Sequence, residues 1–316
     1  MNILSSADIR KDLREVLISK YGNLTFQFYS DISEADKNLP EADVLITYGE
    51  DLTARHIEKA VKLKWIMVIS AGLDEMPFEA IGKRNILVTN ARGIHRTPMA
   101  EYTMAMMLQA ARQTKRLIEN EQQGTWERTL AMTELCGTTI CVLGTGAIGQ
   151  EIARLAKAFG MKTSGINRTG RKVEYFDRVE PCDNLDVLLT EADFVVSVLP
   201  KTKATDRMLA KKQFHLMKQN AVLINIGRGN VIDDEELIGA LTEGSIAHAV
   251  LDVFNEEPLP KEHPYWRMKN VTVTPHLSGR SPEYQPRALE IFERNLKVFL
   301  QGKENYINRI DPDKGY

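Results

Sequence analysis

Residues 139–160 read TICVLGTGAIGQEIARLAKAFG and decide the fold of this 316-residue chain. Thr139 to Leu143 form a short apolar run that is typical of a buried strand, and a glycine-rich turn follows at once. Apolar residues then recur at helical spacing up to Gly160, where the helix is predicted to end. A strand, a tight turn and a helix in this order begin the unit from which parallel α/β sheets are built.

The turn itself is predicted to bind a dinucleotide. Its glycines match the spacing GxGxxG, which is a weak signal alone and a much stronger one between a strand and a helix. Glycine lets the backbone approach a pyrophosphate, and the helix N-terminus adds free N–H groups and a positive dipole. The alternative is an ordinary strand-to-helix turn. We therefore expect cofactor contacts from Gly144, Gly146, Ala147, Ile148 and Gly149.

The next predicted strand, KTSGI, is followed by Asn167, Arg168 and Thr169, where this fold normally carries an acidic residue. A carboxylate there accepts hydrogen bonds from the adenosine ribose and repels the extra phosphate of NADP, whereas an arginine binds that phosphate. The sequence therefore predicts NADP as the cofactor, with NAD as the alternative. Under that alternative the arginines are solvated loop charges, and Glu174 or Asp177 reaches back to the ribose.

Apolar runs alternate with amphipathic stretches on both sides of the glycine loop, which predicts parallel strands covered by helices. We predict an α/β fold of two Rossmann/flavodoxin-like domains, joined by a helical segment over residues 97–131. The dinucleotide-binding domain, residues 96–287, is inserted into a discontinuous substrate-binding (catalytic) domain made of residues 1–95 and 288–316. The expected strands read NIL, TFQF, DVLIT, WIMVIS and ILVTN in the first series, and TICVL, KTSGI, FVVSVL, AVLINI, AHAVLDVF and VTVTP in the second.

The overall composition favours a small-molecule ligand. The 41 Lys and Arg residues nearly balance the 43 Asp and Glu residues, so neither nucleic acid nor a membrane surface is the expected partner. We expect a cytoplasmic protein, because no apolar run is long enough for a membrane span and charges come too early for a signal peptide. Cys136, Cys141 and Cys182 form no CxxC pair and are expected to be packing residues. No metal site is predicted.

Three side chains follow later strands at their carboxyl ends, the edge where open parallel sheets bind ligands. Arg228 lies between two glycines, which are expected to leave room for a planar substrate beside the guanidinium. Glu257 follows the strand that ends near Asp252, and His276 follows VTVTP. An arginine can anchor a carboxylate, a histidine can donate a proton, and a carboxylate can tune it. Singly, each has an alternative as a structural cap, a solvated loop charge or a surface histidine, but their joint placement predicts reduction of a 2-keto acid.

Five further stretches carry a resemblance to a known family. They read TNARGIHRTPMAEYTMAMML, SVLPKTKATDRML, LINIGRGNVIDDEELIGAL, AVLDVFNEEPLPKEHPYW and VTVTPHLSGRS. With the glycine loop, they make the chain resemble the D-isomer-specific 2-hydroxyacid dehydrogenases over nearly its whole length. The departure from the family pattern is Asn167 in place of an acidic residue. Together with PLPKEHPYW and the ending DPDKGY, it makes the chain most similar to the NADP-using glyoxylate and hydroxypyruvate reductase branch.

The resemblance implies roles for individual residues. Arg228 would contact the substrate carboxylate and carbonyl, His276 would be the acid/base, and Glu257 would orient the histidine. Asp252 would face the nicotinamide carboxamide, and backbone N–H groups of Val68-Ile69-Ser70-Ala71-Gly72 would bind the substrate carboxylate. We accordingly expect substrate contacts from Ser70, Ala71, Gly72, Arg228 and His276, and further cofactor contacts from Leu199, Pro200, Thr205 and Ile226.

The expected function is reduction of a small 2-keto acid, glyoxylate-like or hydroxypyruvate-like, to the D-2-hydroxy acid with hydride from NADPH. One alternative is NAD-dependent oxidation, as in phosphoglycerate dehydrogenases, for which an acidic residue 167 and a long C-terminal regulatory domain are expected. Another is a non-catalytic relative that senses nucleotide. Formate oxidation is disfavoured, because it does not need the Glu257 and His276 pair. We also expect a homodimer, formed through the apolar faces of residues 97–131 as in the family's dimers.

Overall fold

The computed structural model describes residues 1–73 and 75–312, and the chain divides into two compact units. Unit 1 combines Met1–His95 with Ser281–Tyr316, and unit 2 is Arg96–Arg280. Each unit holds one parallel sheet with helices between its strands, which confirms the predicted α/β class.

The chain returns to unit 1 earlier than the sequence indicated, at 280/281 and not at 287/288. The reason lies in contacts made just after the crossing. The Arg10 guanidinium donates to the Pro282 carbonyl at 3.0 Å, and the Arg10 backbone N–H donates to Gln285 Oε1 at 2.9 Å. The residues that begin the last helix are therefore already fixed to the N-terminal segment.

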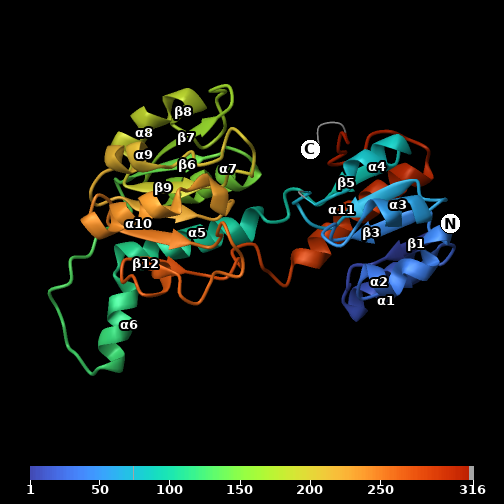
Figure 1. Cartoon of the computed structure of the whole chain (residues 1–316), viewed down its shortest axis with the longest axis horizontal. Coiled ribbons are helices and arrows are strands. Elements are labelled where there is room, and N and C mark those ends of the chain that lie inside the picture. Colours follow the sequence, from blue (N-terminus) through green and yellow to red (C-terminus); the bar gives the residue numbers. More distant parts are fainter. Residues whose placement is uncertain (74, 313–316) are drawn as a thin grey trace. The chain divides into compact units, whose positions relative to one another are not determined.

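Unit 1 is a five-stranded parallel sheet in the order β2-β1-β3-β4-β5 (Figure 1). This is the flavodoxin-like strand order. Its strands are β1 (Asn2–Ser5), β2 (Thr25–Phe28), β3 (Val44–Thr47), β4 (Trp65–Val68) and β5 (Leu87–Asn90). Its helices are α1 (Lys11–Lys20), α2 (Ile32–Ala35), the 3-10 helix η1 (Asp36–Glu41), α3 (Ala54–Lys59), α4 (Phe78–Lys83) and α11 (Tyr284–Leu300).

Neighbouring side chains of each central strand of unit 1 enter different cores, because successive residues point to opposite faces of a sheet. Ile3 and Val44 belong to the core that includes residues of α1 and α11. Leu4 and Leu45 belong to the core that includes residues of α2, α3 and α4. Both faces are covered, which explains why these strands read as continuous apolar runs in the sequence.

Unit 2 is a seven-stranded parallel sheet in the order β12-β11-β10-β9-β6-β7-β8 (Figure 1). This is the doubly wound Rossmann order with one more strand at an edge. Its strands are β6 (Thr139–Leu143), β7 (Lys162–Asn167), β8 (Arg178–Pro181), β9 (Phe194–Ser197), β10 (Val222–Asn225), β11 (His248–Leu251) and β12 (Val271–Val273). Its helices are α5 (Arg96–Ala111), α6 (Thr114–Gln122), α7 (Ala147–Ala158), α8 (Leu185–Glu191), α9 (Lys211–Leu216) and α10 (Asp234–Glu243), with 3-10 helices η2 (Cys182–Asn184), η3 (Gly229–Val231) and η4 (Pro264–Trp266).

The strand quoted at the outset, β6, shows how the sheet of unit 2 is covered. Ile140 and Val142 lie in the core that α5 and α7 complete, whereas Cys141 and Leu143 lie in the core that α8, α9 and α10 complete. The helix α6 extends away from the sheet (Figure 1). The strand is thus buried on both faces, as its apolar run predicted.

Two parts of unit 2 differ from the expectation. The sequence indicated six strands, and the structure adds a seventh, β8, which was missed because RVEP is short, charged and ends in a proline. Such a strand is tolerated at a sheet edge, where β8 lies. The helical segment expected over 97–131 is helical only in α5 and α6, since Gln113 between them has a φ of +53° and Gly124 after them a φ of +64°.

The C-terminal segment packs on the sheet of unit 1. Arg309 and Thr89 form an antiparallel bridge, and the Ile310 N–H donates to the Val88 carbonyl at 2.9 Å. The Ile310 side chain is buried in the core beside α4. Residues 313–316, the last four of the ending DPDKGY, lie outside the described residues.

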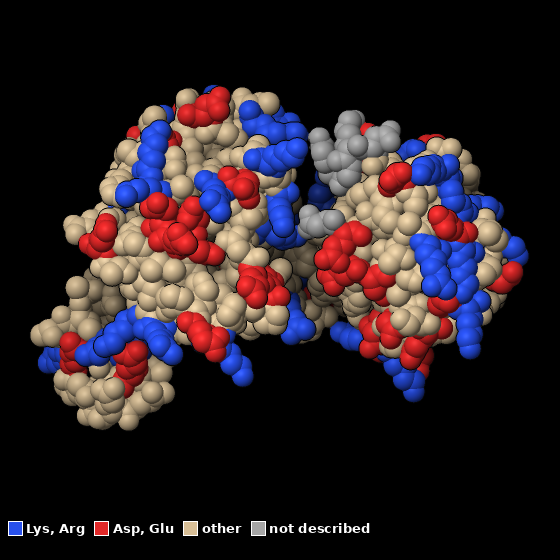
Figure 2. Space-filling model, viewed as in Figure 1, with Lys and Arg blue, Asp and Glu red and all other residues tan. Residues whose placement is uncertain are grey.

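The surface of each unit carries both signs of charge, interspersed over the face that Figure 2 shows. No helix within residues 1–73 and 75–312 combines the length and the apolar character needed to cross a membrane. Cys141 is a packing residue as expected, and burial raises the pKa of its thiol to about 12. Cys182 is half-buried, whereas Cys136 is exposed, so the expectation that all three are packing residues does not hold for Cys136.

Candidate functional site

The residues predicted to bind cofactor and substrate in unit 2 follow the carboxyl ends of its strands. Because the strands are all parallel, these ends meet at one edge of the sheet (Figure 1). The positions in question are Gly144 after β6, Asn167 at the end of β7, Leu199 after β9, Ile226 and Arg228 after β10, Asp252 and Glu257 after β11, and His276 after β12.

The glycine loop is shaped by contacts that only glycine allows. Gly144 has a φ of +105°, which favours glycine. A Cβ at Gly149 would lie 2.0 Å from the Gly144 carbonyl oxygen, so the third glycine closes the turn against the first. At Gly146, by contrast, a Cβ would meet no described atom within 4 Å. The second glycine therefore leaves its backbone open at the N-terminus of α7, which is the surface that a pyrophosphate needs.

The loop after β7 is organised by the side chain of Asn167. Asn167 Oδ1 accepts the backbone N–H groups of Thr169 and Arg171, each at 3.1 Å. Its Nδ2 donates to Thr145 Oγ1 at 3.0 Å and to the Arg171 carbonyl at 2.9 Å. The amide thus uses both its acceptor and its donors, and it joins this loop to the glycine loop. Arg168 and Arg171 are exposed beside it.

One version of the NAD alternative does not agree with this geometry. Asp177 pairs with Lys157 and accepts the Thr163 N–H at 2.9 Å, near the start of β7. That position is at the opposite end of the strand from Asn167. Asp177 therefore does not reach the carboxyl edge where a ribose would lie. Glu174 is exposed, and its carboxylate raises the pKa of the Tyr175 hydroxyl.

The loop after β9 holds three of the remaining predicted cofactor residues. Leu199 and Thr205 are buried, and Pro200 is exposed. Thr205 Oγ1 donates to the Pro200 carbonyl at 2.6 Å and accepts the Thr202 N–H at 3.0 Å, so its hydroxyl closes the loop on itself. Ile226, after β10, is buried in the core beneath α5 and α7.

The glycines on either side of Arg228 serve a different purpose from the expected one. A Cβ at Gly227 would lie 2.6 Å from the Leu199 carbonyl oxygen, and a Cβ at Gly229 would lie 2.0 Å from the Phe254 carbonyl carbon. Both positions are filled by protein backbone and leave no room for a substrate. Glycine is required there because three loops approach one another, and the Arg228 loop packs directly on the segment that leads to Glu257. The Arg228 guanidinium donates to the Gly227 carbonyl at 2.9 Å and is half-buried.

His276 and Glu257, predicted from separate strands, form a pair. His276 Nδ1 lies 2.8 Å from Glu257 Oε2, and the Phe254 N–H donates to Glu257 Oε1 at 2.9 Å. A carboxylate only accepts hydrogen bonds, so Nδ1 carries a proton and Nε2 is the nitrogen left for chemistry. The side chains of His276 and Glu257 are 51% and 36% exposed, respectively, so the pair is open to a ligand.

The backbone that carries His276 is held by Asp252. His276 has a φ of +49°, a left-handed conformation that costs a non-glycine residue about 1–2 kcal/mol. Three successive N–H groups point at Asp252: His276 donates to its carbonyl, Leu277 to Oδ1 and Ser278 to Oδ2, each at 2.9 Å. Asp252 is completely buried. Its observed contacts therefore fix the loop of the histidine.

Sequence reasoning did not identify Thr274, whose hydroxyl donates to Asp252 Oδ1 at 2.5 Å. A threonine at the end of a strand is common, and nothing in the pattern distinguishes this one. The contact could be anticipated only from the register of β11 and β12, which places Leu251 beside Val273.

In unit 1, the loop expected to bind the substrate carboxylate follows β4. The Ser70 hydroxyl shares its one proton between the Tyr48 carbonyl at 3.2 Å and the Gly72 carbonyl at 3.0 Å, and Asn90 Nδ2 donates to the Ala71 carbonyl at 3.1 Å. Ser70, Ala71 and Gly72 are half-buried. The N–H group of Ile69 is already used in the sheet, where it donates to the Thr47 carbonyl at 2.8 Å.

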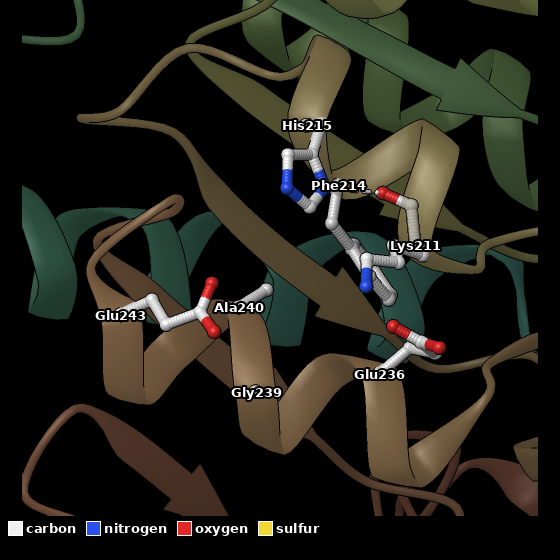
Figure 3. Close-up of a pocket in the computed structure, with 7 residues that line it drawn as sticks. All are labelled: Lys211, Phe214, His215, Glu236, Gly239, Ala240 and Glu243. Carbon is white, nitrogen blue, oxygen red and sulfur yellow. Dashed lines mark hydrogen bonds between the residues drawn. The ribbon is translucent and has the colours of Figure 1, made fainter.

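Figure 3 shows a small cavity of unit 2 that is separate from these loops, between α9 and α10. It is lined by Lys211, Phe214, His215, Glu236, Gly239, Ala240 and Glu243. Its volume of about 40 Å³ has room for only a few water molecules. The carboxyl edge of the sheet, and not this cavity, is the candidate site.

A family model matches the part of the chain that carries the loops of unit 2. The model described as "D-isomer specific 2-hydroxyacid dehydrogenase, NAD binding domain" matches residues 104–278. The chain belongs to the D-isomer specific 2-hydroxyacid dehydrogenase family. As a member of this family it is an NAD(P)-dependent 2-hydroxyacid dehydrogenase, with a nicotinamide dinucleotide as cofactor and small 2-hydroxy acids as the class of substrate.

Individual relatives cover most of the chain. A D-3-phosphoglycerate dehydrogenase from Methanocaldococcus jannaschii is 38% identical over 86% of this chain, which spans about half (53%) of that relative's length. Glyoxylate/hydroxypyruvate reductase B from Serratia proteamaculans is 32% identical over 97% of both chains.

Two solved structures share the fold over almost the whole chain. A D-isomer specific 2-hydroxyacid dehydrogenase family protein from Aeromonas salmonicida is 34% identical, with a TM-score of 0.90 over 99% of both chains. An acyclic imino acid reductase in complex with NADPH and D-Arg is 26% identical, with a TM-score of 0.84 over 98% of this chain and all of the other.

Proposed function

We propose that the protein reduces a small 2-keto acid, of the glyoxylate or hydroxypyruvate class, to the D-2-hydroxy acid with NADPH. The observation that carries this proposal is the His276 and Glu257 pair at 2.8 Å, at the carboxyl edge of a nucleotide-binding sheet. The name of the Serratia proteamaculans relative, a glyoxylate/hydroxypyruvate reductase, supports the substrate class.

His276 is the proton donor in this proposal. When bound, the reduced nicotinamide supplies the hydride that reaches the C2 carbonyl carbon. The carbonyl oxygen then gains negative charge, and His276 gives it the proton from Nε2 while Nδ1 keeps its bond to Glu257. Glu257 fixes the ring and stabilises its positive charge. Reduction therefore needs the imidazolium at the start, and oxidation needs the neutral ring.

Arg228 is proposed to bind the substrate carboxylate and carbonyl oxygen. Its guanidinium can form two parallel hydrogen bonds to a carboxylate, which orients the C2 carbon and stabilises the developing charge. The backbone N–H groups of Ser70, Ala71 and Gly72 are proposed to contribute to carboxylate binding. Gly229 keeps the Arg228 loop against the backbone before Glu257, so the arginine and the acid are positioned by one contact.

The cofactor preference is proposed from the loop after β7. The open backbone at Gly146 fits a pyrophosphate. Asn167, Arg168 and Thr169 follow the neighbouring strand, and the bond from Asn167 to Thr145 links them to the glycine loop. Asn167 adds no negative charge, and the exposed Arg168 and Arg171 offer the cations that a ribose phosphate requires. The imino acid reductase of similar fold was solved with NADPH. We therefore favour NADPH over NADH.

The loops after β9, β10 and β11 are proposed to complete the cofactor site. Leu199, Pro200, Thr205 and Ile226 would line the path of the dinucleotide, and Asp252 would receive the nicotinamide carboxamide. The closed hydrogen bonds of Thr205 favour a shaping role for its hydroxyl.

A second candidate function is NAD-dependent oxidation of a D-2-hydroxy acid. The D-3-phosphoglycerate dehydrogenase relative, at 38% identity, favours it. Asn167 opposes it, because no carboxylate stands there to accept hydrogen bonds from the ribose. The two functions differ in cofactor and in direction, so one assay separates them.

We also propose a homodimer that uses α6 and the segment after it. Trp126 is 91% exposed, and Ile118 and Met132 are exposed on the same part of unit 2. Light scattering on the wild type and on Ile118→Glu/Trp126→Asp tests this. A dimer that becomes a monomer in the variant supports the proposal, and a monomeric wild type contradicts it.

The function is tested by a matrix of cofactors and substrates. Oxidation of NADPH and of NADH is followed with glyoxylate, hydroxypyruvate, pyruvate and bulkier 2-keto acids, and reduction of NAD with D-3-phosphoglycerate. The proposal expects the highest kcat/KM with NADPH and a small 2-keto acid. Faster oxidation of D-3-phosphoglycerate by NAD would select the second candidate. Tight cofactor binding without turnover of any substrate would instead favour a nucleotide sensor.

A further inference from the structure

We propose that Tyr102 and Thr274 are positioning residues, which hold the His276 loop through a directed chain of hydrogen bonds that ends on Asp252. The inference rests on the proposed role of His276. It adds two side chains that, among the hydrogen bonds of the described residues, contact neither His276 nor Glu257, and one of them is Tyr102 on α5. The backbone carbonyl of Thr274 also accepts the His276 N–H at 3.1 Å.

The direction of the chain follows from counting protons. Thr274 Oγ1 lies 2.5 Å from Asp252 Oδ1 and 2.6 Å from the Tyr102 hydroxyl. A carboxylate can only accept, so the single hydroxyl proton of Thr274 is donated to Asp252. Tyr102 must then donate to Thr274. Hydrogen bonds aligned in this way polarise and strengthen one another, so the tyrosine stabilises the contact between Thr274 and Asp252.

The receiving end of the chain is the acceptor for the loop. Asp252 Oδ1 also accepts the Leu277 N–H, and Oδ2 accepts the Ser278 N–H, both at 2.9 Å. These bonds keep His276 in its left-handed conformation, with a φ of +49°. Asp252 is buried, so water cannot replace its hydrogen-bond partners. A change in the orientation of its carboxylate would therefore move the loop. The position of the imidazole thus depends on where Thr274 holds the carboxylate.

The donating end is fixed in space and in protonation state. Gln109, on the same helix α5, donates to Thr272 Oγ1 at 3.0 Å, and Lys115 donates to the Val271 carbonyl at 2.9 Å. The helix region is therefore fastened to β12 along the strand. Burial, with the nearby Asp252 charge, raises the pKa of Tyr102 to about 12. Tyr102 consequently stays a neutral donor across the working pH range.

A positioning role predicts a particular kinetic pattern. Thr274→Val removes both hydroxyl bonds at nearly constant volume, and Tyr102→Phe removes only the outer one. Turnover should fall about tenfold in Thr274→Val, which loses a hydrogen bond to a carboxylate as well as the neutral one, and about threefold in Tyr102→Phe, which loses only the neutral one. The KM for the 2-keto acid and the Kd for NADPH should stay within about twofold, because the changed step is proton donation. Thr274→Ser should restore turnover.

Matched controls separate positioning from general stability. Asn270→Ala removes a side-chain hydrogen bond of 3.0 Å to the Leu241 carbonyl just before β12, outside the chain that runs from Tyr102 to Asp252, so it should lower Tm and leave kcat unchanged. The double variant Tyr102→Phe/Thr274→Val should be no slower than Thr274→Val alone, because both changes break one chain.

The experiment measures kcat, KM, NADPH Kd and Tm for all these variants, with His276→Ala alongside. If His276→Ala retains turnover, the proposed function fails. If His276→Ala is inactive while Thr274→Val and Tyr102→Phe keep the wild-type kcat, the positioning role fails alone. It also fails if the two changes act additively, or if they raise KM or Kd while kcat is kept.

Discussion

The loops after β7 and β12 are built alike but differ in charge and burial. Each lies at the carboxyl edge of the same sheet, and in each one side chain accepts two nearby backbone N–H groups. In the first loop that side chain is Asn167, neutral and half-exposed. For the second loop the accepting side chain is Asp252, which follows the neighbouring strand β11 and is ionisable and completely buried.

The charge and burial of the accepting side chain suit each loop to a different role. A neutral amide closes the Asn167 loop without adding negative charge beside Arg168, so an anion can still bind there. A buried carboxylate closes the His276 loop more firmly, because hydrogen bonds to charged groups contribute about 1.5–3 kcal/mol. The first loop suits selection of a cofactor, and the second suits the exact placement of a proton donor.

The largest effect on turnover is expected when the His276 imidazole, which the second loop positions, is removed. His276→Ala should lower kcat by about 10²–10⁴-fold, the usual contribution of a general acid. The Kd for NADPH, measured by fluorescence titration, should change little. Loss of cofactor binding in parallel with turnover would mean that His276 serves the nucleotide and not the proton transfer.

Asp252→Asn tests the hydrogen bonds that hold the His276 loop. One oxygen is replaced by an NH2 group that cannot accept the Leu277 or Ser278 N–H, which leaves a buried donor unpaired at a cost of about 1–3 kcal/mol. We expect kcat to fall about 100-fold together with a lower Tm.

Asp193→Asn is the matched control for Asp252→Asn. Asp193 accepts the Thr139 N–H at 2.9 Å at the start of β6, and pairs with Lys218. Its variant should lose stability but not kcat. Equal kcat losses in the two variants would show that general destabilisation, and not loop placement, lowers turnover.

Substitutions in the first loop should change the preference between NADPH and NADH and leave the proton-transfer step unchanged. Asn167→Asp/Arg168→Ala places a carboxylate against the Arg171 carbonyl and removes one cation. The ratio of kcat/KM for NADPH to that for NADH should fall about 10- to 100-fold, since charge-assisted contacts of 1.5–3 kcal/mol are lost. Arg178→Ala, an exposed arginine paired with Glu180 on β8, is the control and should keep the ratio. An unchanged ratio in the double variant would place the phosphate elsewhere, for example on Arg171 or Lys172.

The smallest effect on activity is expected at the other end of strand β11, where it starts at His248. This histidine hydrogen-bonds Thr272 at 3.0 Å, and burial, with Lys115 nearby, lowers its pKa from 6.5 to about 4. The folded state therefore resists protonation that the unfolded state accepts. The contribution of neutral His248 to the free energy of unfolding is fully present above about pH 6.5. It is lost as the pH falls towards 4, by up to about 3 kcal/mol.

His248→Gln should remove much of that acid sensitivity while keeping a polar group near Thr272. Urea unfolding at pH 7.5 and pH 4.5 measures it, and kcat at pH 7.5 should stay at the wild-type value. The same pH dependence in both proteins would assign the acid sensitivity to other groups.

The contrast between the loops also shows what a sequence can and cannot predict. The glycine loop and Asn167 follow from local rules, since a strand, a turn and a helix lie within one short segment. The pairing of His276 with Glu257 can be predicted because the carboxyl ends of parallel strands lie at the same edge of the sheet. Each of these inferences uses neighbours in sequence or in strand order.

Contacts that depend on packing in three dimensions lay outside that reasoning. Tyr102 and Thr274 are 172 positions apart, and their bond depends on where α5 lies against β12. The glycines around Arg228 were misread for the same reason, because their neighbours are backbone atoms of loops that follow other strands. The edge strand β8 was missed because its charged residues and proline obey the rules of a sheet edge, which a hydrophobic pattern does not detect.

The central claim is that the protein uses NADPH and His276 to make a D-2-hydroxy acid. The most direct measurement incubates the purified protein with hydroxypyruvate and either NADPH or NADH, follows cofactor oxidation, and separates the glycerate formed on a chiral column. We expect D-glycerate as the product, formed at least tenfold more efficiently with NADPH, and almost none from His276→Ala. L-glycerate, a preference for NADH, or full turnover without His276 would contradict it.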